Sequence, residues 1–234
     1  MRVHIGTSGF SYAPWRGSFY PEKLPAAKML AYYAERLDAV EINNTFYRMP
    51  TTDALAKWAN EVPAGFQFVL KSPKRITHDK KLADVADTLA RLHEVGAGAL
   101  GERLGPVLFQ LPPFLKKDLP RLADFLAHLP QGLRAAVEFR HDSWFSDDVY
   151  EALRAGGAAL CLAESEELAT PVEATSPTWG YLRLRRQDYD DAGLAAWVDR
   201  LRAQPWQTAY VFFKHEDEGK GPKLAARFRE LLEA

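Results

Sequence analysis

The chain has 234 residues, of which 47% are hydrophobic and 26% are charged, and its formal net charge is −1. These values are ordinary for a globular protein, and they exclude a chain whose overall charge attracts nucleic acid or a membrane surface. The length allows one large domain, and no linker or low-complexity tract divides it, so we expect a single domain over residues 1–234.

Several common site types have no sequence signal. Cys161 is the only cysteine, which rules out an intrachain disulfide and the paired-cysteine metal motifs. The glycine-containing turn after the first strand, GTSGF at residues 6–10, lacks GxGxxG, and no GxxxxGK[ST] occurs, so we expect no cofactor. The N-terminus has no long apolar leader, and no run approaches the length of a membrane span. We therefore expect a cytoplasmic protein without a membrane partner, of unknown oligomeric state.

Eight apolar runs rich in β-forming residues recur along the chain. They are residues 2–6, 39–43, 66–71, 106–111, 134–139, 158–163, 179–185 and 208–214. Helical patterns separate most of them, and the clearest cover residues 25–37, 51–63, 146–157, 191–205 and 222–234. Pro25 suits a first helical position, Thr51 or Thr52 suits the next start, and Ser146 is the expected cap of a helix that ends at Gly156.

Alternation of strands and helices implies a parallel sheet, because parallel neighbours need crossover connections. Eight repeats predict closure into a TIM-like (β/α) barrel of eight parallel strands with about seven helices. After the sixth strand, residues 164–178 are too short and too broken by proline for a good helix, so we expect an irregular sixth unit. An open doubly wound sheet is the alternative fold.

Polar side chains gather where these strands end, which in such barrels is where chemistry takes place. Strand alternation puts Glu138 and Arg140 on the same face of the fifth strand. In the same way, Arg183 and Arg185 share one face of the seventh strand. An unpaired glutamate pointing at the helices would be costly. We therefore expect Glu41 and Glu138 to point into the barrel, with Arg140 and Arg183 as counter-charges. Ion pairs that only fill the barrel interior are the structural alternative.

Six motifs in the same order resemble those of the family catalogued as domain of unknown function 72, also called YecE-like. They are IGTSGFSY followed by W, G and FYP, then VEINNTFYRMP, LKSPKRITH, GPVLFQLPP, VEFRHDSW and YLRLR. The resemblance extends from Ile5 to about the C-terminus. It implies a TIM-barrel-type fold and leaves the activity open, because the family's biochemical role is not established.

The resemblance also identifies polar positions that match the family's motifs. These are Glu41, Asn43, Lys71, His78, Gln110, Glu138, Arg140, Trp144, Tyr181 and Arg183. Two places depart from the pattern. Many members resemble RLHG after the seventh strand, where this chain has RLRR at residues 183–186, and an Asn-rich end of the eighth strand is replaced by Lys214 and His215. Both departures add positive charge at the predicted barrel mouth.

The first functional hypothesis is an enzyme for a small anionic, or phosphorylated, substrate. The anion clamp would consist of Lys71, Arg140, Arg183, Arg185 and Lys214. Glu138 or Glu41 would be the general acid or base, with His78 or His141 as proton partner. Further residues expected to contact substrate are Tyr12, Trp15, Asn43, Phe46, Gln110, Trp144 and Tyr181.

Three alternatives stay open at this point. The first is nucleic-acid or nucleotide binding without catalysis, through a basic rim that includes Lys74, Lys80 and Lys81. Another is a metal-dependent hydrolase or isomerase that uses His78, His141 and His215, although no HxH or HExxH spacing supports it. The last is a glycoside hydrolase with Glu41 and Glu138 as its carboxylate pair. Its cationic surroundings are poorly suited to a neutral sugar.

Overall fold

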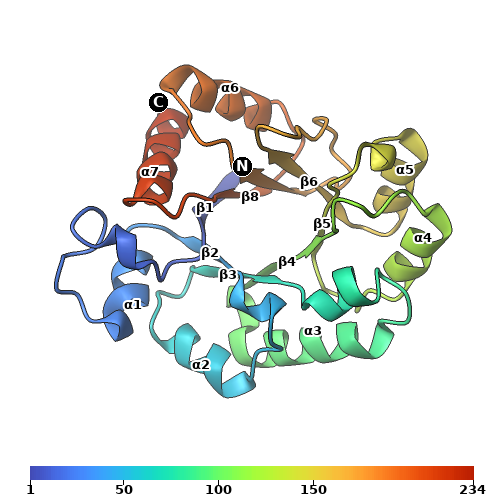
Figure 1. Cartoon of the computed structure of the whole chain (residues 1–234), viewed down its shortest axis with the longest axis horizontal. Coiled ribbons are helices and arrows are strands. Elements are labelled where there is room, and N and C mark those ends of the chain that lie inside the picture. The colour runs from blue at the N-terminus through green and yellow to red at the C-terminus, as the bar shows by residue number, and fades with distance from the viewer.

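The computed structural model describes all 234 residues, and its centre is a closed barrel of eight parallel strands in sequential order. Figure 1 looks into the ring of strands, with the helices arranged around its outside. Strand β1 pairs with both β2 and β8, which closes the ring. The strands are β1 (Arg2–Ser8), β2 (Ala39–Ile42), β3 (Gln67–Lys71), β4 (Leu104–Gln110), β5 (Ala135–Glu138), β6 (Ala159–Glu164), β7 (Trp179–Leu184) and β8 (Thr208–Phe213).

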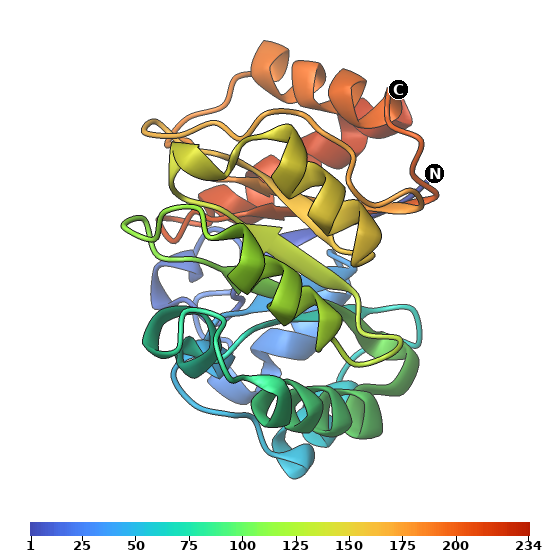
Figure 2. The same ribbon diagram turned by 90° about the vertical axis from the view of Figure 1, so that its right-hand side faces the viewer.

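Seven α-helices cover the barrel, as the sequence predicts, and none lies between β6 and β7. The turned view of Figure 2 shows the helices of the middle of the chain packed side by side on the outside of the strands. The closed barrel confirms the predicted fold and removes the open-sheet alternative. The helices are α1 (Met29–Ala34), α2 (Thr52–Asn60), α3 (Ala86–Leu100), α4 (Leu119–Ala127), α5 (Asp147–Ala155), α6 (Asp191–Arg202) and α7 (Lys220–Glu233).

Helix starts follow the expected capping chemistry at some positions and not at others. The Thr51 hydroxyl accepts from the Ala54 amide and caps α2, as predicted. Ser146 precedes α5, but its hydroxyl makes no cap and donates to the Asp148 carboxylate instead. The helix expected from Pro25 begins with a 3₁₀ turn, and α1 starts only at Met29.

Two apolar layers hold the barrel together. The larger lies between the strands and the surrounding helices. The smaller fills the barrel interior, where alanines of β5 and β6 share a cluster with Tyr181, Tyr210 and Phe212 from β7 and β8. Small residues on one side leave room for the aromatic rings of the other, so the interior is packed rather than open.

No helix in the structure combines the length and the apolar composition needed to cross a bilayer.

Candidate functional site

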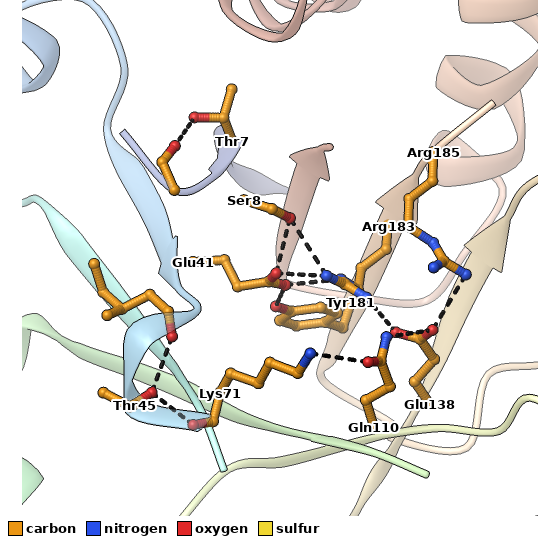
Figure 3. A network of polar contacts seen from close by, with 12 residues as sticks. Thr7, Ser8, Glu41, Thr45, Lys71, Gln110, Glu138, Tyr181, Arg183 and Arg185 are labelled. Atoms are coloured by element: carbon orange, nitrogen blue, oxygen red, sulfur yellow. Dashed lines mark hydrogen bonds and ion pairs between the residues drawn. The ribbon is translucent and has the colours of Figure 1, made fainter. Parts of the chain in front are cut away.

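The floor of the barrel mouth is a buried ion pair between Glu41 on β2 and Arg183 on β7. The Arg183 Nε and Nη2 donate to the two carboxylate oxygens of Glu41 at 2.9 and 2.7 Å. The Tyr181 hydroxyl donates to the same carboxylate at 2.6 Å and the Ser8 hydroxyl at 2.8 Å. Glu41 is fully buried, and these four bonds occupy both of its oxygens, as Figure 3 shows.

Arg183 also binds a second buried carboxylate, Glu138 on β5. Its Nη1 donates to Glu138 at 2.6 Å, and the Gln110 side-chain amide donates to the other oxygen at 2.9 Å. Arg185 approaches that same oxygen with its Nη2 at 3.3 Å. One guanidinium therefore links two strands across the barrel interior, as expected for Arg183 from strand alternation. Arg140, the other expected counter-charge, pairs with neither glutamate.

These contacts keep both carboxylates ionised. Burial alone would raise the pKa of Glu138, but the charges of Arg183 and Arg185 outweigh it and lower that pKa to about 2. Burial opposes ionisation of Glu41 as well, and the Arg183 charge again holds the pKa below its ordinary value. Such groups are poor proton donors and weak bases at neutral pH. The geometry assigns them to holding Arg183 in place rather than to the predicted acid–base role.

Above this floor lies a polar cavity with a volume of about 320 Å³. It is lined by five cationic side chains, among them the floor residue Arg183, and by a single carboxylate. Neither Glu41 nor Glu138 lines it. The lining residues are Tyr12, Asn43, Phe46, Tyr47, Lys71, Gln110, Arg140, Arg183, Arg185, Lys214 and Glu216.

Lys71, the last residue of β3, has the most unusual surroundings of these cations. Its Nζ donates to the Gln110 side-chain oxygen at 2.9 Å and lies 4.5 Å from the centre of the Phe46 ring. Gln110 thus stands between Lys71 and Glu138, accepting from one and donating to the other. Burial, and next the charge of Arg183, lower the pKa of Lys71 to about 8.

Of the expected substrate contacts, Tyr12 and Phe46 are aromatic residues that reach the cavity. Tyr12 lines it with its hydroxyl donating to the Ser8 carbonyl at 2.6 Å, and Phe46 lies against Lys71. Trp15 is fully buried among Tyr12, Phe19 and Tyr20, and it does not line the cavity. The structure gives no support to its expected contact with substrate, because the indole belongs to the packing of the loop after β1.

The indole predicted on the fifth loop is also a packing residue. Trp144 is buried against Phe139 with ring centres 4.6 Å apart, and its Nε1 donates to the Leu115 carbonyl at 2.7 Å. Tyr181 is buried too, and it reaches the site only through its bond to Glu41. Trp144 thus lies outside the cavity, whereas Tyr181 belongs to its supporting floor.

The histidines predicted as proton partners lie beside the cavity rather than in its wall. His78 packs edge-to-face on Phe46 at 4.9 Å, and its Nδ1 contacts the Thr77 hydroxyl at 2.9 Å. His141 lines a neighbouring cavity of about 210 Å³, which also includes Arg140 and Arg185. His215 lines a third cavity. The three imidazoles do not converge, and no group of three or more His, Cys, Asp or Glu side chains is arranged to hold a metal ion.

Sequence reasoning missed two residues of the site, Ser8 and Glu216. Glu216 lines the cavity, and Ser8 donates to Glu41 from the end of β1. Tyr47 is among the aromatic residues expected after the second strand, and it lines the cavity beside Phe46. Glu216 follows Lys214 by two residues, so its place after a strand end is the signal that could identify it. Ser8 and Glu41 are register partners on the neighbouring strands β1 and β2, and the sequence alone does not give that register.

Comparisons with known proteins agree with one another. The family model described as "Protein of unknown function DUF72" matches residues 4–234. The UPF0759 protein YecE of Escherichia coli (strain K12) is 32% identical over 260 aligned positions, which cover 98% of this chain and 92% of that protein. The UPF0759 protein YunF of Bacillus subtilis (strain 168) is 29% identical over 156 residues, which cover 64% of this chain and 54% of that protein.

Solved structures give the same result. A crystal structure of a DUF72 family protein from Thermotoga maritima MSB8 superposes with a TM-score of 0.87 at 26% identity and covers 100% of both chains. A DUF72 family protein from Enterococcus faecalis V583 has a TM-score of 0.80 at 18% identity, covering 99% of this chain and 96% of that one. The second likeness, at that identity, speaks for the fold alone.

Proposed function

Because the chain belongs to the DUF72 family of proteins of unknown function, whose name carries no activity, we propose its function from the site itself. The protein is proposed to be an enzyme that binds a small anionic substrate, such as a phosphate monoester, in the cavity at the barrel mouth. Arg140, Lys71 and Lys214 would contact the anion, and Arg183 and Arg185 would form the positive floor beneath it.

One observation carries this proposal: three cations line a single cavity without pairing to any carboxylate. The ion pairs of the site all go to Arg183 and Arg185, which leaves Lys71, Arg140 and Lys214 free of them. Like charges brought together in this way repel one another, and an anion bound between them relieves that cost. Clusters of guanidinium and ammonium groups are what phosphate and carboxylate ligands require.

The charge balance of the site favours a dianion. Five cationic side chains line the cavity or its floor, against Glu216 and the buried Glu41 and Glu138, which leaves an excess of two positive charges. The Nε of Arg185 adds a buried donor without a partner in the protein. A phosphate monoester carries close to two negative charges at neutral pH and supplies several acceptor oxygens. These features support a phosphorylated ligand over a neutral one.

The other hypotheses fit less well. A glycosidase needs two carboxyl groups that flank the scissile bond, whereas Glu41 and Glu138 lie beneath Arg183 and do not line the cavity. The metal-dependent hydrolase needs converging ligands, and His78, His141 and His215 lie in separate surroundings.

Isothermal titration with inorganic phosphate and a panel of sugar phosphates and nucleotides tests the proposal, with turnover of each bound ester followed by ³¹P NMR. Arg140→Ala is expected to weaken binding by at least about ten-fold, the effect of losing one charge-assisted contact. Arg91→Ala, on the exposed face of α3, is the matched control and is expected to change nothing. Absence of binding, or equal binding by both variants, rejects the anion site.

Nucleic-acid binding remains a second candidate, favoured by two exposed aromatic rings on the loops of the same end of the barrel. Tyr47 is 78% exposed and Phe114 is 66% exposed, and the Lys81 ammonium lies 5.6 Å from the centre of the Phe114 ring. Exposed rings beside lysines are how proteins stack single-stranded bases. Salt-dependent binding of an oligonucleotide that is lost in the Tyr47→Ala, Phe114→Ala double variant would favour it over the small anion.

A further inference from the structure

Lys71 differs from the other cations of the cavity in ways that a simple anion contact does not require. Its amine is held from two sides, by the Gln110 oxygen at 2.9 Å and by the face of Phe46 at 4.5 Å. No carboxylate pairs with it, since the ion pairs of Glu41 and Glu138 go to Arg183 and Arg185. The amine is thus fixed in place at the cavity wall, and no carboxylate forms an ion pair with it.

Burial is the main cause of the lowered pKa of Lys71, and the neighbouring charges act in both directions. Burial is the largest effect, and Arg183 and Lys214 act in the same direction against Glu41 and Glu138. With the pKa lowered to about 8, about one-tenth of the amine is neutral at pH 7, against well under one-hundredth for an ordinary lysine. The other charged and titratable side chains that line the cavity or pack against its wall are Tyr12, Tyr47, His78, Arg140, Arg185 and Glu216.

We propose that Lys71 is a nucleophile that forms an imine with the carbonyl group of a small anionic aldehyde or ketone held by Arg140 and Lys214. This inference rests on the proposed function and narrows its substrate class to anions that also carry a carbonyl group. A fixed amine beside a cationic cluster is the arrangement in which lysines act as nucleophiles toward carbonyl carbons.

The step needs no oxidant or cofactor. The Nζ lone pair attacks the carbonyl carbon, the carbon–oxygen π pair moves to oxygen, and one proton passes from nitrogen to oxygen to give a carbinolamine. Loss of that hydroxyl with the second amine proton releases water and leaves a carbon–nitrogen double bond. Glu216 is the carboxylate of the cavity lining that can exchange these protons with solvent. The Gln110 oxygen keeps the amine directed while this happens.

Reductive trapping of the intact protein tests the proposal. Glyoxylate, a small carbonyl anion, and acetaldehyde, a neutral control, are each added with cyanoborohydride at pH 7.5, and labelled lysines are quantified by mass spectrometry. Lys71 is expected to react at least about ten-fold faster than the exposed Lys23 and Lys57, because more of its amine is neutral. Glyoxylate is expected to label it faster than acetaldehyde, and inorganic phosphate to compete.

The outcomes separate this inference from the function on which it rests. Labelling of Lys71 no faster than that of Lys23 and Lys57 by both reagents overturns the nucleophile, whether or not phosphate binds. Fast labelling by both reagents, with no advantage for glyoxylate and no competition by phosphate, keeps the nucleophile and rejects the anionic substrate. Lys71→Arg, which cannot form an imine, is expected to abolish the fast labelling, and fast labelling that persists in this variant would overturn the assignment of the nucleophile to Lys71.

Discussion

Arg183 on β7 reaches across the barrel interior to Glu41 on β2, and two of its nitrogens meet the two carboxylate oxygens at 2.9 and 2.7 Å. Both side chains are buried, and the third nitrogen of the same guanidinium is used by Glu138. All three nitrogens of Arg183 are therefore committed to protein contacts. The arrangement fixes a positive floor under the cavity, and it makes stability depend on one side chain.

Replacing Arg183 by methionine is expected to lower the free energy of unfolding by about 3–5 kcal/mol, because it leaves two buried carboxylates without their counter-charge. Urea denaturation measures the change. Arg227→Met, which removes an exposed ion pair to Asp191, is the control and should have little effect. If Arg183→Met does not fold, the triple variant that adds Glu41→Gln and Glu138→Gln should recover much of the loss. A triple variant no more stable than the single one would contradict this account.

Acid should weaken the same network over a definite range. The folded pKa of Glu138 is about 2, below its ordinary value of 4.5, so its ionised form favours the folded state. The stabilisation of the folded state by ionised Glu138 is complete above about pH 4.5 and is lost as the pH falls toward 2. Urea titrations at pH 6, 4 and 3 should show stability falling, with a smaller fall in Glu138→Gln. An equal fall in both proteins would mean that Glu138 does not contribute.

Local patterns in the sequence predicted the fold and part of the site. Eight strands separated by helical segments were sufficient for a barrel, and alternation along β2, β5 and β7 was sufficient to point Glu41, Glu138 and Arg183 inward. What failed depends on distances between strands that are remote in the sequence. An inward carboxylate can line the cavity or form an ion pair with a guanidinium beneath it, and the distance between strands decides which. Glu138 and Arg183 form such a pair although they are 45 residues apart in the sequence.

Trp15 and Trp144 also show that the sequence alone does not separate cavity residues from packing residues. Trp15 and Trp144 follow strand ends, where pocket aromatics are common, yet both are buried in packing clusters. An indole covers so much apolar area that loops use it as an anchor as readily as a ligand platform. Only the packing of the neighbouring loop, here Leu115 and Phe139, decides between the two roles.

Trp144→Phe provides a direct check of that assignment. The variant keeps an aromatic ring against Phe139 but removes the Nε1 donor and leaves the Leu115 carbonyl unpaired, so we expect a loss of about 1–2 kcal/mol in the free energy of unfolding. Phosphate affinity, measured by titration calorimetry, should stay within about two-fold of the original protein, since the indole does not line the cavity. A large loss of affinity at unchanged stability would return Trp144 to the site.

The buried charge of Lys71 is expected to lower the free energy of unfolding. Its folded pKa of about 8 lies below the ordinary 10.5, so the unfolded chain binds the proton more tightly and the folded state is penalised. The penalty is complete below about pH 8 and disappears as the pH rises toward 10.5. Lys71→Met should therefore raise the free energy of unfolding at pH 7 by about 1–2 kcal/mol, a figure reduced for the part of the side chain that water still reaches.

The same variant should bind phosphate more weakly, so that stability and affinity move in opposite directions. Lys57→Met on the exposed face of α2 is the matched control, and we expect it to change neither quantity. Urea titrations at pH 7 and pH 10 separate the causes, because the advantage of Lys71→Met should shrink at the higher pH if it comes from the buried charge. An advantage equal at both values would instead point to better apolar packing against Phe46, and the lowered pKa would lose its support.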